Sequence, residues 1–167
     1  MRSRSRAVAV CTALLGGAFL VGFSVPEGSP EAPAGVPAKA QDAEVEAIVD
    51  HRRAVMRAAG GHLSAAAAIL MDGLPHEGTL AAHGAAVGAL FQMDMPAFFP
   101  EGSLHEESEA VQAIWDDWDG FVERYEDTAE RAQAFAEATQ GGDQGAMIEA
   151  FAALGDSCGA CHESFRE

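Results

Sequence analysis

The chain has 167 residues, of which 26 are acidic and 10 basic, so its formal net charge is −16, and 49% of the residues are hydrophobic. This length suits one domain, and the apolar content excludes a disordered acidic tail. So much negative charge repels phosphate backbones and anionic lipid surfaces, which excludes nucleic acid as a partner.

The N-terminal 40 residues have the pattern of an export signal. Arginines within the first six residues precede an apolar run from Ala7 to Phe23, and a Pro- and Gly-rich linker leads to the cleavage motif Ala38-Lys39-Ala40. We therefore expect residues 1–40 to be signal peptide and linker, and residues 41–167 to be an exported, periplasmic domain. The apolar run lies at the lower edge of what spans a bilayer, so an uncleaved membrane anchor stays open as an alternative.

Cleavage after residue 40 changes the charge and the cysteine content. It removes four of the 10 cations and two of the 26 acids, which leaves 6 and 24 and a net charge of −18. It also removes Cys11, so the exported domain keeps Cys158 and Cys161. Cysteines in an oxidising compartment are usually paired or ligated.

The first half of the domain predicts two helices. Apolar residues recur at helical period from Val45 to Leu70, before the breaker sequence at 72–75. The second helix begins at His76 or Thr79, and Pro96 is predicted to stop it. This helix is rich in Ala and Gly, and its glycines at 84 and 88 would let another helix approach closely.

The second half predicts a loop and two more helices. The loop covers residues 96–103, and its Phe98 and Phe99 are expected to cover one end of the core. The third helix carries an apolar stripe from Val111 to Phe135 and ends at Gly141-Gly142. Asp143 is the predicted N-cap of the last helix, whose apolar face reaches Phe165. No strand alternation is visible.

Four helices with short connections favour an all-α fold, an antiparallel four-helix bundle. Many of the predicted interior positions are alanine, which buries little apolar area per residue. A large apolar cofactor in the core would supply the missing burial.

The sequence Cys158-Gly159-Ala160-Cys161-His162 has the C-x-x-C-H pattern of covalent haem c attachment. Each thiol can form a thioether to a vinyl group, and the adjacent histidine can ligate the iron. Two other interpretations of the same residues are a redox-active C-x-x-C disulfide and half of a zinc site. A haem-free helical interaction module whose cysteines form a disulfide is a further alternative for the function. The zinc site would need two further ligands, and the sequence shows no histidine pair at ligand spacing.

An exported four-helix chain with this motif at its C-terminal end resembles the cytochrome c' family, the class II c-type cytochromes. The resemblance covers residues 45–167. It rests on Arg52-x-x-x-Met56 in the first helix, Phe99-Pro100-Glu101-Gly102-Ser103 before the third helix, Ala113-Ile114-Trp115 and the ending Cys161-His162-Glu163-Ser164-Phe165-Arg166. It implies one haem c, bound covalently through Cys158 and Cys161, and a bundle that encloses it.

The resemblance also implies roles for individual residues. His162 is the expected proximal iron ligand, and Arg166, one turn later, is the expected basic neighbour of that histidine or a simple helix-end cation. Met56 is expected on the distal side, where it ligates iron as a sixth ligand or packs as a core methionine. Arg52 is expected to pair with a haem propionate or to lie on the surface. Low-spin and high-spin members of the family both exist, so the sequence leaves the iron ligation by Met56 open.

For the remaining polar and aromatic residues we expect mainly structural roles. The histidines at 51, 62, 76, 83 and 105 are expected on the surface or as satisfied core residues. Trp115 is expected in the core near the porphyrin edge. The acidic residues from Asp116 to Glu130 are expected to form a solvated helix face, with docking of a basic redox partner as the functional alternative.

The predicted function is a periplasmic mono-haem electron carrier that is not an enzyme, since the sequence offers no carboxylate pair, nucleophile triad or phosphate loop. The alternative is a protein that binds nitric oxide or carbon monoxide at an open distal site. The expected partner of the electron carrier is a redox protein, and the expected ligand of the alternative function is a diatomic gas. The resemblance implies a homodimer formed through the first two helices.

Overall fold

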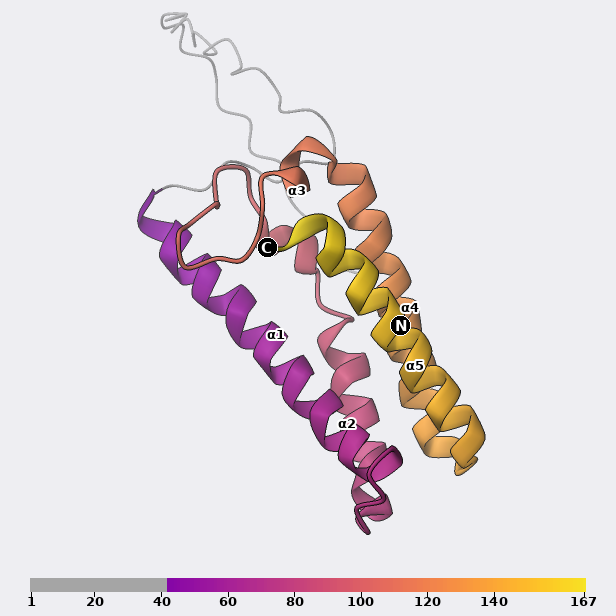
Figure 1. Cartoon of the computed structure of the whole chain (residues 1–167). Helices are drawn as coiled ribbons and strands as arrows, with labels where there is room; N and C mark the ends of the chain where they lie inside the picture. The colour runs from indigo at the N-terminus through magenta and orange to yellow at the C-terminus, as the bar shows by residue number, and fades with distance from the viewer. Residues whose placement is uncertain (1–41) are drawn as a thin grey trace, which may run out of the picture. The chain divides into compact units, whose positions relative to one another are not determined.

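The computed structural model describes residues 42–167, so the predicted signal peptide and linker at 1–40 lie outside the described residues. Six helical elements follow in chain order (Figure 1): α1 Asp42–Leu70, α2 Glu77–Leu90, the 3-10 helix η1 Met95–Phe98, α3 Ala113–Asp116, α4 Trp118–Gly141 and α5 Gln144–Phe165. Within residues 42–167 the only β pairing is an isolated bridge between Ala110 and Arg166.

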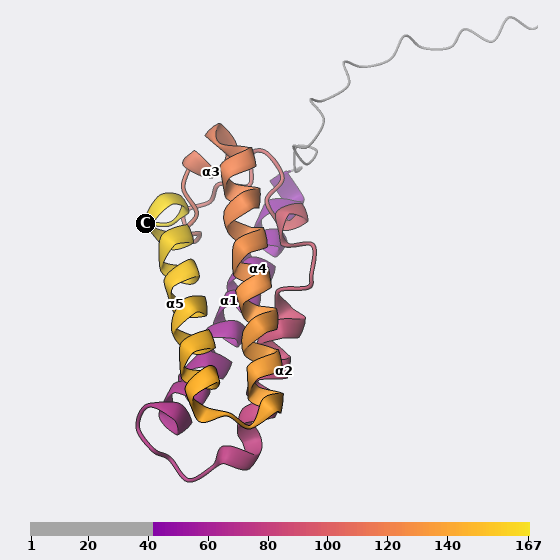
Figure 2. The same ribbon diagram turned by 90° about the vertical axis from the view of Figure 1, so that its right-hand side faces the viewer.

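The four long helices form the predicted antiparallel bundle. α1 packs on α2, α2 on α4, and α4 on α5, and a view turned by 90° shows α4 and α5 side by side in front of α1 and α2 (Figure 2). α1 and α5 diverge toward the end of the bundle that holds the C-terminus (Figure 2). The connection between α2 and α4 lies at that end.

Two predicted helix boundaries are confirmed by their backbone geometry. Asp143 caps α5, because its carboxylate accepts a hydrogen bond of 2.7 Å from the backbone N–H of Ala146. Gly142, which ends α4, has φ +77°, a left-handed conformation that glycine adopts at little cost.

The prediction of one continuous third helix is wrong, because the chain forms two helices, α3 and α4, with a break at Asp117. Asp117 has φ −132° and ψ 61°, outside the helical region, and its carboxylate accepts a hydrogen bond of 3.3 Å from the N–H of Gly120. The side chain therefore ends α3 and caps α4, because an N-cap satisfies an amide that the new helix leaves free.

The end of the second helix also differs from the prediction. α2 stops at Leu90, and Pro96 lies inside η1 instead of ending α2. Tyr125 of α4 contributes to the earlier stop, because its single hydroxyl proton is shared between the carbonyl oxygens of Phe91 at 2.9 Å and Met93 at 2.6 Å. These carbonyls are satisfied without a further helical turn.

The glycines of α2 receive a helix of the same chain. A Cβ at Gly84 would lie 2.3 Å from Thr139 Oγ1, and a Cβ at Gly88 would lie 3.0 Å from the Cβ of Ala136. Both contacts are to α4. The expectation that this face receives another helix is right, but the face is buried within the bundle and is not free for a second copy.

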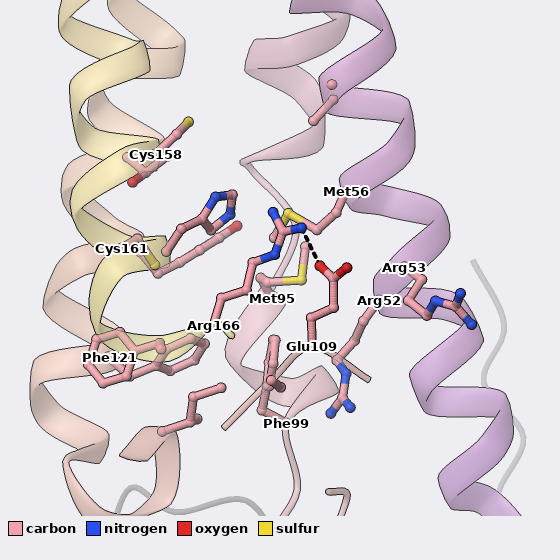
Figure 3. Close-up of a pocket in the computed structure, with 18 of the residues that line it drawn as sticks. Arg52, Arg53, Met56, Met95, Phe99, Glu109, Phe121, Cys158, Cys161 and Arg166 are labelled. Atoms are coloured by element: carbon pink, nitrogen blue, oxygen red, sulfur yellow. Dashed lines mark ion pairs between the residues drawn. The ribbon is translucent and has the colours of Figure 1, made fainter. Parts of the chain in front are cut away.

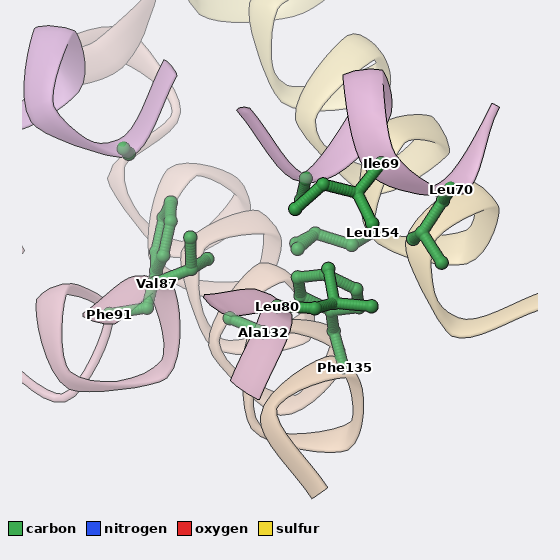
Figure 4. Packing of buried hydrophobic residues seen from close by; sticks show 10 residues of the cluster. Ile69, Leu70, Leu80, Val87, Phe91, Ala132, Phe135 and Leu154 are labelled. Carbon is green, nitrogen blue, oxygen red and sulfur yellow. The ribbon is translucent and has the colours of Figure 1, made fainter. Parts of the chain in front are cut away.

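The core has two parts. One fills the end near the α1–α2 and α4–α5 turns, with Phe135 and Leu154 fully buried among Ile69, Leu80 and Val87 (Figure 4). The other part lies at the end with the C-terminus and contains Phe99, Phe121 and Phe165, whose rings pack edge to face. The prediction that Phe98 and Phe99 cover one end of the core is confirmed, with Phe99 buried in this part and Phe98 partly buried against it.

None of the helices within residues 42–167 has the length and the hydropathy needed to cross a membrane.

Candidate functional site

A cavity of about 550 Å³ lies between α1, α4, α5 and the segment that joins α2 to α4. This volume is typical of a site for a small molecule or cofactor. Its walls are mainly apolar and aromatic, and they include Leu63, Phe91, Met95, Phe99, Ile114, Phe121 and Phe165. The cavity is the unfilled interior that the alanine-rich sequence predicted.

The predicted haem-attachment residues line this cavity together. Cys158, Cys161 and His162 all come from the last two turns of α5, where spacings of three and four residues place side chains on one face. Figure 3 shows both cysteines on the α5 side of the cavity. The sequence therefore located the attachment wall correctly.

Both cysteines are free, half-buried thiols. Burial raises the pKa of each above its usual value. The charge of Cys161 adds to this effect at Cys158, whereas Arg124 opposes it at Cys161. The two side chains are therefore neutral thiols facing an apolar cavity, without a disulfide between them. This state fits thioether formation with vinyl groups.

A zinc site receives no support from the described part of the chain. Across residues 42–167, no group of three or more His, Cys, Asp or Glu side chains gathers at metal-binding distance. The two cysteines and His162 thus have no further partners there, and a tetrahedral structural site needs four ligands.

The imidazole of His162 is available as a ligand. Partial burial lowers its pKa, the positive charge of Arg166 lowers it further, and the negative charge of Glu109 acts in the opposite direction. A neutral imidazole has a free nitrogen lone pair, which is what an iron ligand requires.

Arg166 also lines the cavity, next to His162, as predicted. Its guanidinium forms an ion pair with Glu109 (Figure 3). The backbone reinforces this contact, since the N–H of Glu167 donates to the carbonyl of Glu109 at 3.0 Å and Ala110 bridges to Arg166. The chain end is therefore tied to the segment before α3 at the mouth of the cavity.

Met56 lies on α1 and lines the cavity (Figure 3). Its side chain is 38% exposed. The cysteines and His162 of α5 and Met56 of α1 thus line the same cavity from two helices that diverge around it (Figures 2 and 3). Of the two expectations for this residue, the buried core methionine does not fit this exposure, and Met56 is a methionine that faces the cavity, as expected for the distal side.

Arg52 departs from one of its two sequence expectations. It is only 4% exposed, so the surface interpretation is wrong. Its guanidinium donates to the carbonyl of Ser103 at 2.9 Å and to the hydroxyls of Ser103 at 2.8 Å and Ser108 at 3.1 Å, with a further bond to the carbonyl of Phe98. It also lies 4.6 Å from the ring centre of Phe99. The residue holds the 98–108 segment against α1.

The buried charge of Arg52 has no anionic partner in the described part of the chain, where none of the ion pairs includes it. Burial lowers its pKa to about 10. A buried cation is costly unless an anion compensates it. Since Arg52 also lines the cavity, a carboxylate-bearing cofactor would supply that anion.

The other cations of the domain gather at the same place. Four of the six arginines in residues 42–167 line the cavity, namely Arg52, Arg53, Arg57 and Arg166. The domain as a whole is strongly acidic, so this cluster of arginines makes the cavity border locally positive. A cavity with apolar walls and a cationic border fits haem, which has a flat apolar ring and two propionates.

Sequence reasoning missed one candidate ligand, and it was right that Trp115 packs against the core but not that it lies at the cavity. Met95, in η1, is 1% exposed and lines the cavity with a second thioether. Trp115 does not line the cavity, since its Nε1–H donates to the carbonyl of Phe99 at 3.0 Å. The position of Met95 follows from the path of the 91–112 segment, for which the sequence has no periodic signal.

Comparison with known proteins agrees with this geometry. Residues 47–166 match the family model described as Cytochrome C'. The chain is 38% identical over 126 residues to "Cytochrome c'" of Pararhodospirillum photometricum, covering 75% of this chain and 100% of that protein. It is 33% identical to "Cytochrome c-554" of Cereibacter sphaeroides, covering 79% and 89% of the two chains.

A solved structure shares the fold. The structure of cytochrome c prime from Shewanella frigidimarina superposes with a TM-score of 0.70 at 26% identity, covering 74% of this chain and 97% of that chain.

Proposed function

The chain belongs to the cytochrome c' family and binds one haem c covalently through Cys158 and Cys161, and we propose that it is a periplasmic electron carrier and not an enzyme. When bound, haem supplies an iron that cycles between the ferric and ferrous states. The single observation that carries the proposal is that His162 of α5 and Met56 of α1 line one cavity. A histidine and a methionine are the axial ligand pair of electron-transfer cytochromes.

In this proposal His162 is the proximal ligand and Met56 the sixth ligand. The lowered pKa of His162 keeps its imidazole neutral and able to bind iron. The rings of Phe99, Phe121 and Phe165 cover the cavity end and exclude water from the bound group. Arg52 is placed to compensate a propionate, because its buried charge lacks an anion within residues 42–167.

The spin state of the iron tests the ligation. The absorption and magnetic circular dichroism spectra of the purified ferric protein are expected to show six-coordinate, low-spin iron. The spectra of Met56→Leu are expected to show five-coordinate, high-spin iron. Met71→Leu is the matched control, because Met71 is 61% exposed and lies outside the cavity lining. Met95→Leu separately tests the second sulfur. A high-spin wild-type spectrum would contradict ligation by Met56.

Binding of nitric oxide or carbon monoxide at an open distal site is the second candidate function. The observation that favours it is that Ala59 and Gly60, next to Met56, line the cavity with almost no side-chain volume. A diatomic molecule would fit there if Met56 does not bind iron. Rapid carbon monoxide binding by the ferrous wild-type protein, with no lag from methionine displacement, would support this function over electron transfer.

The proposed redox partner has a basic docking face. The acidic residues along α4 are mostly exposed, as expected, and only Asp127 is bound in an ion pair with Arg131, within the part of the chain that the structure describes. Exposed charges of one sign steer association and make its rate depend on salt. Electron-transfer rates that do not fall with rising ionic strength would contradict docking on this face.

We also propose a homodimer. Since Gly84 and Gly88 are buried on α4, the faces available for it are the exposed small residues of α1 and α2, which include Ala58, Gly61, Ala82 and Ala85. Small residues let helix backbones approach closely. Sedimentation of the haem-loaded protein at micromolar concentration is expected to show a dimer, and a monomer alone would contradict it.

The periplasmic location depends on the predicted signal in residues 1–40. Fractionation of cells that express the full chain, with the N-terminus of the product sequenced, tests both export and cleavage. Product that stays in the membrane fraction with residues 1–40 attached would favour the anchor.

A further inference from the structure

A pair of histidines lies outside the haem cavity. His62 of α1 and His83 of α2 have their Nδ1 atoms 3.0 Å apart and their ring centres 5.3 Å apart, with the ring planes at 56°. Both side chains are half-buried, and neither lines the cavity. The two residues are 21 positions apart in the chain, so only the packing of α1 on α2 brings them together. The haem function gives no reason for this pair.

The two Nδ1 atoms are at hydrogen-bond distance, so in the metal-free protein one imidazole donates its N–H to the other, and the same spacing suits chelation of a metal ion in place of that proton. Two imidazole nitrogens bound at 2.0–2.1 Å to one ion are about 2.9 Å apart at a right angle and about 3.4 Å apart in a tetrahedron. The observed 3.0 Å lies within this range. Neutral imidazole is the commonest metal ligand in proteins, and it suits Zn²⁺, Cu²⁺ and Ni²⁺.

The neighbours of His62 on α1 are small, and both histidine side chains are partly exposed to solvent. One turn before and after His62 stand Ala58 and Ala66, which project only methyl groups. Within residues 42–167 no third His, Cys, Asp or Glu joins the two histidines. The remaining coordination positions would therefore be filled by water, which reaches the half-exposed rings.

We propose that His62 and His83 form a two-histidine site for a divalent ion of the Zn²⁺, Cu²⁺ and Ni²⁺ class, which links α1 to α2. Two ligands on separate helices bind together only in the folded bundle. An ion that binds the folded state and not the unfolded chain raises the melting temperature in a concentration-dependent way. The two-histidine site does not depend on how iron is ligated, so it can be tested independently of the proposed function.

Zinc is the suitable probe, because it does not change oxidation state and so leaves the iron unaffected. Calorimetric titration of the haem-loaded, chelator-treated protein with zinc chloride is expected to give one Zn²⁺ per chain with micromolar affinity. The melting temperature is expected to rise with zinc. His62→Gln and His83→Gln are each expected to weaken binding at least tenfold and to abolish the rise in melting temperature.

His76→Gln is the matched control, because His76 is an exposed histidine at the start of α2 that is not part of the pair. It is expected to bind zinc as the wild-type protein does. The visible spectrum of each variant checks that the haem site is intact. If one variant fails to fold, the other variant decides, together with zinc-edge X-ray absorption on the wild-type protein, which should show two imidazoles per zinc. Wild-type affinity weaker than millimolar, unchanged affinity in both variants, or fewer than two imidazoles per zinc would each overturn the site.

Discussion

Arg166 and Glu109 form an ion pair at the mouth of the haem cavity, where the last turn of α5 meets the segment before α3. The two charges act on His162 in opposite directions, since Arg166 lowers its pKa and Glu109 raises it. The pair therefore sets the electrostatic environment of the proposed iron ligand from the mouth of the cavity.

Neutralising Glu109 and neutralising Arg166 are expected to shift the reduction potential of the haem in opposite directions. Glu109→Gln removes a negative charge that stabilises ferric iron, so the potential rises, and Arg166→Gln lowers it, each by an amount on the order of tens of millivolts. Stability changes by less than about 1 kcal/mol, because the pair is half exposed. Spectroelectrochemical titration measures both shifts. Shifts of the same sign would contradict the argument.

Removing the Arg52 guanidinium is expected to be costly. Arg52→Met keeps the length of the side chain but leaves the carbonyls of Phe98 and Ser103 without their donor. Each buried carbonyl without a partner costs about 1–3 kcal/mol, so we expect a loss of about 2–4 kcal/mol. Guanidinium denaturation of the haem-loaded protein measures it.

The matched control for Arg52 is Arg131→Met, which removes a half-exposed ion pair with Asp127 on α4. It is expected to cost less than about 1 kcal/mol. Equal losses in the two variants would show that the buried network contributes nothing specific.

Two glycine-to-alanine changes are expected to have opposite effects. Gly84→Ala places a methyl group 2.3 Å from Thr139 Oγ1, and the resulting overpacking of α2 on α4 is expected to destabilise the bundle by about 1–3 kcal/mol. Gly61→Ala meets no atom within 4 Å and is expected to stabilise α1 by about 0.5–1 kcal/mol. Thermal unfolding of both variants checks the signs.

Tyr125 is expected to make stability depend on alkaline pH. Burial raises the pKa of its hydroxyl above the usual value of 10.0. Above pH 10 the unfolded chain loses this proton first, so the contribution of Tyr125 is complete below pH 10 and is lost as pH rises through the folded-state pKa. Urea midpoints from neutral to alkaline pH should fall more steeply for the wild-type protein than for Tyr125→Phe. Parallel curves would contradict the prediction.

Preventing haem attachment is expected to loosen the bundle around the empty cavity. In Cys158→Ala/Cys161→Ala the apolar walls would meet water, and the charge of Arg52 would lack its anion. We expect helical circular dichroism to persist with a lower melting temperature and increased binding of a hydrophobic dye. An equally stable, dye-free variant would show that the cavity does not depend on haem.

Much of the fold and of the attachment site was predictable from the sequence. The apolar period from Val45 to Leu70 and the capping residue Asp143 act locally, and α1 and α5 follow them. The Cys158, Cys161 and His162 motif needs only one helix face to bring its groups together. The break at Asp117 was missed because the helical period of the flanking apolar residues continues across it.

By itself the sequence determined the helices, the covalent haem attachment and the family, because helical periodicity and a C-x-x-C-H motif depend on neighbours within a few residues. Only the tertiary structure decided that Arg52 is buried against Ser103, that Met95 reaches the cavity, that Gly84 receives α4 and that His62 meets His83. These contacts join residues far apart in the chain. They depend on the angles and registers at which whole helices pack, and no short-range pattern encodes those.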